Sequence, residues 1–307
     1  MDLSIVIVTW NVKDLLRACL QSLQADCRAT SALVAEIIVV DSASADGSAQ
    51  MVRDEFPQVR LIVSDQNLGY AGGNNMGVAA TQGRYLFLLN PDTVVKPGAL
   101  ACLVHYMDTQ PQVGAVAPKL LWPDGAVQSS RRRFPTLGSL FWESTLWEQW
   151  FPNNPAARRY HCANRPTDQP QSVDWVVGAA LVVRREAWAQ VGPLEADFFM
   201  YFEETDWCRR AAGLDWQVHY LPQAQVIHYE GRSSEQVMAA RALRFQRSKL
   251  RYTRKYFGRS WAAVLRLFLW STFALQWLEE SAKWLVGHRR DMRRQRMTAY
   301  GQLLREL

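Results

Sequence analysis

The chain has 307 residues, 49% of them hydrophobic, which is enough for one large domain with its own core. Its five cysteines include no CxxC pair, which argues against a disulfide framework or a zinc site and favours a reducing cytosol. Residues 1–230 carry 18 basic and 24 acidic side chains, whereas residues 231–307 carry 17 basic and 5 acidic ones. An acidic body joined to a basic tail indicates an anionic partner, either nucleic acid or a membrane surface.

The first third of the chain alternates apolar runs with segments of helical periodicity. The first run begins almost at the N-terminus with no basic segment before it, so no signal peptide is expected. The predicted strands lie in 3–11, 36–48, 59–65 and 84–89, and the predicted helices in 13–24, 49–56 and 71–82. This β-α alternation predicts a parallel sheet covered on both faces.

Polar residues follow these strands where ligands bind in such sheets, beyond the carboxyl ends. Thr9, Asn11, Asp41 and Asp92 all fall at such ends. Asn90-Pro91-Asp92 is also ordinary turn chemistry, so the stretch on its own does not define a site. The chain has no GxGxxG and no GxxxxGK[ST] motif, which weakens a dehydrogenase interpretation and excludes a P-loop.

Two later segments add candidate residues. "YFEETDWCRR" places Glu203 and Glu204 at a helix start, where acids also have a structural use against the helix dipole. "VIHYEGRSS" ends a strand on His228, and a lone histidine there is usually a surface residue. The arginine run 131–133 is expected to be a solvated face.

Together, these segments resemble the family 2 glycosyltransferases of the GT-A fold, in particular their bacterial rhamnosyltransferase-like branch. The resemblance spans about residues 3–257 and rests on seven motifs in order: "SIVIVTWN", "IIVVDSASADGS", "NLGYAGGNNMG", "LLNPDT", "VVGAALVVRREAW", "FFMYFEETDWCRR" and "VIHYEGRSS". It implies an α/β fold with a mostly parallel, Rossmann-like sheet, helices on both faces and a C-terminal helical extension. The implied organisation is a catalytic domain at 1–230, with a nucleotide-sugar half (1–115) and an acceptor half (116–230), followed by a tail at 231–307.

The resemblance also implies a role for each residue at these strand ends. Residues expected to bind the nucleotide-sugar are Thr9, Asn11, Asp41, Asn67, Gly69 and Asn90. Asp92 matches the last acid of the family's DxD motif and His228 a further ligand, so the two would hold Mg²⁺ or Mn²⁺ on the donor diphosphate. Asn90 stands where the family has the first acid, which leaves no second carboxylate for the metal there.

Sugar transfer needs a base for the acceptor hydroxyl and stabilisation of the leaving group. Glu204 matches the second acid of the family's acid pair, although the family more often has Asp there, so Glu203 stays open as the base. The expected reaction is an inverting hexosyl transfer from a dTDP- or UDP-sugar, with rhamnose the sugar of this branch, to a glycan or lipid-linked acceptor. A sugar nucleotidyltransferase and a non-catalytic glycosyltransferase-like binding protein are the alternatives.

The tail contains a long apolar segment, residues 260–278, which Arg266 interrupts at a depth where a charge is costly in a bilayer. Trp270, Trp277 and Trp284 recur every seven residues, and tryptophan favours the headgroup region. We therefore expect a helix that lies in the interface of an anionic membrane, on the inner face of the cell membrane of a cytoplasmic enzyme. The alternative is packing on the catalytic domain or on a second subunit of a homo-oligomer. Nucleic acid is not an expected partner, because no reading motif accompanies the charge.

Overall fold

The structure, a computed structural model, describes residues 1–307 except 30–32, 144, 146–147, 149, 152–153, 230–237 and 288. The chain divides into two units, each described below by itself. Unit 1 comprises Met1–Phe134, His161–Phe199 and Glu203–Ser233, and unit 2 comprises Pro135–Tyr160, Met200–Phe202 and Ser234–Leu307. The domain boundary predicted at residues 230–231 lies outside the described residues.

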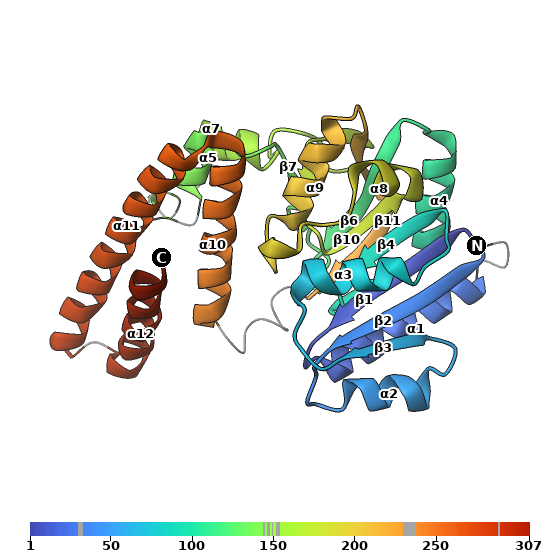
Figure 1. The fold of residues 1–307 in the computed structure, drawn as a ribbon, viewed down its shortest axis with the longest axis horizontal. Helices are drawn as coiled ribbons and strands as arrows, with labels where there is room; N and C mark the ends of the chain where they lie inside the picture. The colour runs from blue at the N-terminus through green and yellow to red at the C-terminus, as the bar shows by residue number, and fades with distance from the viewer. Residues whose placement is uncertain are drawn as a thin grey trace. The chain divides into compact units, whose positions relative to one another are not determined.

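Unit 1 is built on a nine-stranded sheet within the described residues, with the order β3-β2-β1-β4-β10-β6-β11-β5 and with β8 paired to β11 (Figure 1). Its strands are β1 (Leu3–Thr9), β2 (Ala35–Ser42), β3 (Arg60–Ser64), β4 (Tyr85–Leu89), β5 (Thr93–Val95), β6 (Val113–Leu121), β8 (Gln171–Val173), β10 (Ala180–Arg184) and β11 (Gln217–His228). The four strands predicted from the first third of the chain are parallel neighbours, and β10 enters antiparallel to β4. Two further strands, β7 (Arg131–Arg132) and β9 (Trp175–Val176), form a separate pair.

Helices cover both faces of the parallel half of this sheet. They are α1 (Lys13–Ala29), α2 (Ser48–Glu55), α3 (Gly69–Ala79) and α4 (Ala99–Thr109), and the chain adds α8 (Arg185–Val191), η1 (Ala196–Phe198) and α9 (Glu203–Ala212). Alternate residues of β1 point to opposite faces, as in any strand. Leu3, Ile5 and Ile7 share a core with α1 and α4, while Val6 and Val8 face α3. The predicted fold class is therefore confirmed.

The packing of α3 on the sheet explains two of its glycines. A Cβ added at Gly73 would overlap the side chain of Val8, and one added at Gly77 would overlap that of Val6. The glycines therefore let the helix approach the strands at backbone distance. This close approach brings the start of α3 to the carboxyl edge of the sheet (Figure 1).

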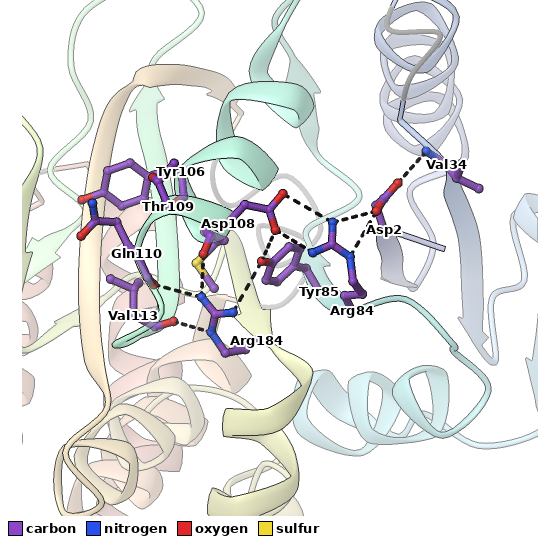
Figure 2. Close-up of polar contacts among 11 residues, drawn as sticks. Asp2, Val34, Arg84, Tyr85, Tyr106, Asp108, Thr109, Gln110, Val113 and Arg184 are labelled. Carbon is purple, nitrogen blue, oxygen red and sulfur yellow. Dashed lines mark hydrogen bonds and ion pairs between the residues drawn. The ribbon is translucent and has the colours of Figure 1, made fainter.

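The amino end of β4 lies in a network of charged side chains (Figure 2). The Arg84 guanidinium donates to the carboxylates of Asp2 (2.8 Å) and Asp108 (2.6 Å). Tyr85 donates its hydroxyl to Asp108 as well, at 2.7 Å. Arg184 donates to the carbonyls of Met107 (2.7 Å), Gln110 (3.0 Å) and Val113 (3.0 Å), closing the C-terminal end of α4. This edge of the sheet is thus tied together by contacts among its own residues.

The arginine run 131–133 is not the solvated face that the sequence predicted. Arg131 is 6% exposed and donates to the carbonyl of Pro166 at 2.6 Å, and its guanidinium stacks on the Tyr220 ring. Arg133 pairs with Asp174 at 3.1 Å. The prediction was wrong for Arg131 because β7 pairs with β9, which turns this side chain inward.

Unit 2 is helical. Its helices are α5 (Leu137–Trp142), α7 (Pro155–Tyr160), α10 (Met238–Phe257), α11 (Arg259–Leu285) and α12 (Arg290–Glu306). α11 packs one face inward through Leu265, Leu269, Phe273 and Glu280, and Glu280 forms a buried ion pair with Arg293 of α12 at 2.6 Å. In the part of the chain that the structure describes, α11 alone has the length and apolar composition to cross a membrane.

Candidate active site

The carboxyl ends of β1 and β2 place two predicted residues side by side. Thr9 and Asp41 are partners in the parallel register, and each is about 1% exposed. One Asp41 carboxylate oxygen accepts the Ser44 amide at 2.9 Å. The other, Oδ2, and the Thr9 hydroxyl have no hydrogen-bond partner although both are buried. Since buried polar atoms are nearly always paired, these two atoms are suited to a polar ligand.

Two loops beside them are shaped by the other predicted binding residues. Asn11 adopts a φ of 54°, and its side-chain oxygen accepts the Ala45 amide at 2.7 Å. Asn67 accepts the Gly69 amide at 3.0 Å, at the start of α3. Gly69 has a φ of 66°, and a Cβ there would overlap the Phe199 carbonyl. In this structure these three residues therefore fix the backbone around the Thr9–Asp41 pair.

The carboxyl end of β4 brings Asp92 to His228. β5 follows Asp92 directly and pairs antiparallel with the end of β11, with His228 opposite Thr93. The Tyr229 amide donates to the Asp92 carbonyl at 2.9 Å. The two side chains are 2% and 4% exposed, and His228 Nε2 lies 3.4 Å from Asp92 Oδ1. Residues 136 positions apart in the chain thus form one buried pair at the edge of the sheet.

This pair fits a divalent cation that takes its remaining ligands from a bound diphosphate. Asp92 Oδ1 is buried and lacks a hydrogen-bond donor, and imidazole nitrogen and carboxylate oxygen are both ligands of Mn²⁺. Mg²⁺ likewise is commonly held by one or two carboxylates and substrate phosphates. Among the described residues no group of three or more His, Cys, Asp or Glu side chains could hold a metal on its own. Asn90 contributes an amide, 3.5 Å from His228 Nε2.

One residue at this pair was missed by the sequence prediction. Gln128 is buried, and its Oε1 lies 2.9 Å from His228 Nδ1. The segment around it, "WPDGAVQSS", has no periodicity, and its one charged residue, Asp124, gives no indication of a role for Gln128.

The acid pair opens α9. Glu203 and Glu204 are 3% and 8% exposed, and each has one carboxylate oxygen without a hydrogen-bond partner. The other oxygen of Glu204 accepts the Gly178 amide at 3.3 Å. Burial raises the pKa of both carboxyls, and the charge of Glu204 raises the pKa of Glu203 further. A carboxylate whose pKa is raised toward neutrality is suited to accept a proton.

Backbone hydrogen bonds join the acid pair to the end of β4. The Asn90 amide donates to the Ala179 carbonyl at 2.9 Å, and Gly178, the preceding residue, holds Glu204. Tyr70 of α3 donates its hydroxyl to the Gly178 carbonyl at 2.6 Å, a contact that the sequence did not predict. The start of α3, the acid pair and the strand end therefore belong to one hydrogen-bonded edge.

The remaining charged residues of the acid motif have a structural role. Asp206 is fully buried and pairs with Arg210 at 2.9 Å. Arg210 also donates to the carbonyls of Val191 and Pro193, at 2.5 and 2.7 Å. These contacts fix α9, and with it the position of Glu203 and Glu204.

Comparison with known proteins identifies a family and a fold. Residues 4–166 match the family profile described as Glycosyl transferase family 2. The chain is 30% identical over 252 residues to the N-acetylglucosaminyl-diphospho-decaprenol L-rhamnosyltransferase of Mycobacterium tuberculosis, covering 78% of this chain and 81% of that protein. It is 25% identical over 171 residues to the rhamnosyltransferase WbbL of Escherichia coli K12, covering 52% and 61% of the two chains. Among solved structures, the mannosyltransferase of Pyrobaculum calidifontis in complex with GDP-Man and Mn²⁺ matches with a TM-score of 0.55 and 16% identity, over 98% of this chain and 84% of that one.

Proposed function

Because this chain belongs to glycosyl transferase family 2, we propose that it transfers a sugar, with inversion at the anomeric carbon, from a nucleoside diphosphate to an acceptor hydroxyl. The observation that carries this proposal is the set of buried, unpartnered polar atoms at one sheet edge. They belong to Thr9, Asp41, Asp92, Glu203 and Glu204. If no ligand bound at this edge, we would expect these polar atoms to be exposed to water or hydrogen-bonded within the protein.

The donor nucleotide is assigned to the β1–β2 end of the site. The Thr9 hydroxyl can donate and the Asp41 carboxylate can accept, which suits the base and the ribose hydroxyls of a nucleoside. Asn11, Asn67 and Gly69 shape the loops around that pair, and Asn90 directly follows β4, the strand beside β1. The donor diphosphate then extends toward Asp92 and His228.

Asp92 and His228 would hold the divalent cation, Mg²⁺ or Mn²⁺. When bound, this ion would neutralise the charge that develops on the leaving diphosphate. Asp92 lies in the turn between β4 and β5, and His228 ends β11, whose pairing with β5 holds the two residues side by side. His228 favours Mn²⁺ somewhat over Mg²⁺, because imidazole suits the softer ion better.

Glu204 is the proposed base. The acceptor O–H bond breaks and its proton goes to the Glu204 carboxylate, while the acceptor oxygen forms a bond to the anomeric carbon. The bond from that carbon to the diphosphate oxygen breaks, and the nucleoside diphosphate leaves with the electron pair. One displacement of this kind inverts the anomeric centre. Glu203, the preceding residue, is the alternative base, since it is also buried with one carboxylate oxygen that has no hydrogen-bond partner.

The acceptor is proposed to be a lipid-linked diphosphate sugar, and the donor dTDP-rhamnose, with a UDP-sugar as the second choice. The support is the similarity to a mycobacterial rhamnosyltransferase whose name describes an N-acetylglucosaminyl-diphospho-decaprenol acceptor. We therefore propose that the enzyme works in the cytoplasm at the inner face of the cell membrane, where such an acceptor would be anchored.

The experiment is a panel of nucleotide-sugars assayed for release of nucleoside diphosphate, with Mg²⁺, Mn²⁺ or EDTA and with or without a lipid-linked acceptor. We expect acceptor- and metal-dependent release with one donor, and a product whose coupling constants by NMR show inversion. Retention would rule out a single displacement. Release of pyrophosphate from a nucleoside triphosphate and a sugar phosphate would identify a nucleotidyltransferase, and donor binding without turnover would identify a binding protein.

Residues 231–307 are proposed to dock on an anionic membrane surface through the outer face of α11. Opposite its packed face, α11 exposes Val264, Leu267, Leu275, Leu278 and Leu285, each between 51% and 71%. Successive members of this set are three, eight, three and seven residues apart, spacings that keep them on one side of a helix with no charge among them, so they form one apolar stripe. A spanning orientation is disfavoured, because the other face of the same helix carries the buried Glu280–Arg293 ion pair.

Charge distinguishes a membrane from a second copy of the chain as the partner of this stripe. Residues 231–307 carry 17 basic and 5 acidic side chains, so two copies would repel each other across a shared face. Anionic lipid instead contributes about 1 kcal/mol for each Lys or Arg near the surface. An apolar stripe in a basic unit is typical of a helix that lies in the membrane interface.

Flotation of the full-length chain with phosphatidylglycerol vesicles tests this docking. We expect binding by the wild type and loss of binding when Leu267, Leu275 and Leu278 are changed to Gln. The matched control changes Val63 and Leu214, exposed apolar residues of unit 1, to Gln. Equal flotation of both variants would contradict the proposal, and a dimer that only the α11 variant loses would assign the stripe to a second copy.

A further inference from the structure

Gln128 is a buried residue of the site to which the proposed reaction gives no role. It is 6% exposed, and its backbone amide donates to the Leu120 carbonyl at 2.9 Å, which ties it to the end of β6. A turn closed by the Gly125 amide on the Trp122 carbonyl, at 2.9 Å, precedes it. The side chain therefore comes from a fixed backbone, and its Oε1 lies 2.9 Å from His228 Nδ1.

A neutral imidazole has one nitrogen that donates and one that accepts, and the partner of one nitrogen decides the state of the other. The Gln128 carbonyl oxygen can only accept, so His228 Nδ1 must carry the hydrogen in this arrangement. His228 Nε2 then presents a lone pair toward Asp92 Oδ1, at 3.4 Å, with the Asn90 side-chain nitrogen at 3.5 Å as a long-range donor. The lone pair and the carboxylate oxygen repel each other in this buried place, and a cation near both would remove that repulsion.

The opposite tautomer would close the site. With the hydrogen on Nε2, His228 would donate it to Asp92, and the buried pair would satisfy itself as an ordinary hydrogen bond. The amide of Gln128 would then have to present its NH₂ group to Nδ1. The orientation of one side-chain amide thus separates a pair that is open to a cation from a pair that is closed.

We propose that Gln128 is a positioning residue, which holds His228 as the Nδ1–H tautomer and so keeps Nε2 available, with Asp92, to a divalent cation. This inference rests on the proposed function, because it concerns the same metal site. Metal-binding histidines commonly donate their second nitrogen to a carbonyl or carboxylate in this manner, and loss of that partner weakens metal binding about 10–100-fold. Glutamine supplies the acceptor here without adding charge.

The first test needs no metal and no substrate. Two-bond ¹H–¹⁵N spectra of the full chain labelled at histidine report the tautomer of each of the five histidines, and His228→Asn identifies the His228 signals by their loss. We expect His228 as the Nδ1–H tautomer in the metal-free wild type at pH 8. The Nε2–H tautomer in that sample would overturn the inference whatever the variants do.

The second test is Mn²⁺ binding in the presence of dTDP, followed by electron paramagnetic resonance. Gln128→Met, which removes the acceptor at similar size, is expected to raise the Kd for Mn²⁺ about 10–100-fold. Gln128→Glu, which keeps an acceptor, should recover most of that loss. Gln169→Met, at an exposed glutamine, is the matched control.

The outcomes separate this inference from the function on which it rests. If His228→Asn weakens Mn²⁺ binding and Gln128→Met leaves it at the wild-type value, Gln128 is not a positioning residue and the metal site stands. If neither His228→Asn nor Asp92→Asn changes Mn²⁺ binding, the metal site itself is wrong, and Gln128 loses its role with it.

Discussion

β4 begins at Tyr85, directly after Arg84. The Arg84 guanidinium is paired with Asp2 and Asp108, and the Tyr85 hydroxyl with Asp108 (Figure 2). At its carboxyl end the same strand leads to Asp92, which has an equally polar side chain but a buried carboxylate oxygen with no donor. The first end is partly exposed to water and nevertheless saturated with partners, whereas the second is buried and unsatisfied. Folding alone accounts for the first arrangement. The second costs stability unless a ligand binds there, which supports the proposed active site at this end.

Asp92→Ala removes the central residue of the unsatisfied end, and we expect the largest effect on activity here. Turnover should fall at least about 10³-fold, since metal-assisted charge stabilisation contributes several kcal/mol. The free energy of unfolding should not fall, because the carboxylate that is removed has a buried oxygen with no hydrogen-bond donor. Steady-state kinetics and urea denaturation of the same preparation measure both. Near wild-type turnover that still requires metal would contradict the metal assignment.

Glu204→Gln tests the acid pair at the same edge. We expect kcat to fall by about 10²–10⁴, the range for loss of a general base, with the donor Kd unchanged. Glu203→Gln is the matched control. If that variant shows the loss in kcat and Glu204→Gln does not, Glu203 is the base. If both retain kcat, the acid pair has no such role.

Glu203→Gln should also change how stability depends on pH. Burial and the charge of Glu204 raise the pKa of Glu203 well above its ordinary value of 4.5, so the folded protein holds this proton more tightly than the unfolded chain does. The stability that depends on the proton is therefore complete below about pH 4.5 and is lost as pH rises through the folded pKa. Glutamine keeps its hydrogens at every pH, so the stability of the variant relative to wild type should be greater at pH 8 than near pH 4.

Denaturation of metal-free protein at both pH values measures this difference. A stability difference of the same size at pH 4 and pH 8 would show that the proton of Glu203 is not involved.

Arg84→Met breaks the saturated end, and it should have the smallest effect. The Arg84 side chain is 51% exposed, and ion pairs at such exposure contribute about 0–1 kcal/mol each. We expect a loss of no more than about 1 kcal/mol in the free energy of unfolding, weaker at high salt, and an unchanged kcat/KM. A large loss of activity would mean that the amino end of β4 is not separate from the site.

The parallel half of the sheet was predictable from the sequence, because buried parallel strands are continuous apolar runs and the helices between them keep their periodicity. The strand ends that carry Thr9, Asp41 and Asp92 followed from the same pattern. His228 did not, since its meeting with Asp92 depends on the pairing of β11 with β5, and β5 has only three residues. Only the family resemblance indicated it.

The environment of side chains between the motifs could not be predicted from the local sequence pattern. Gln128 contacts His228 across 100 positions, and nothing near Gln128 in the sequence signals that contact. Arg131 was assigned to a solvated face because charged runs usually are, whereas the pairing of β7 with β9 buries it against Tyr220 and Pro166. In both cases, long-range strand pairing decides the environment, and the residue type alone does not.

The most direct test of the central claim is a titration of metal and nucleotide into the wild type, Asp92→Asn and Arg84→Met. Binding of dTDP is followed by calorimetry with Mn²⁺ and again with EDTA, and the series is repeated with UDP. We expect tight binding of one nucleotide only with Mn²⁺, loss of that dependence in Asp92→Asn, and wild-type behaviour in Arg84→Met. Equal binding with and without metal in the wild type, or an Asp92→Asn chain that binds as the wild type does, would contradict it.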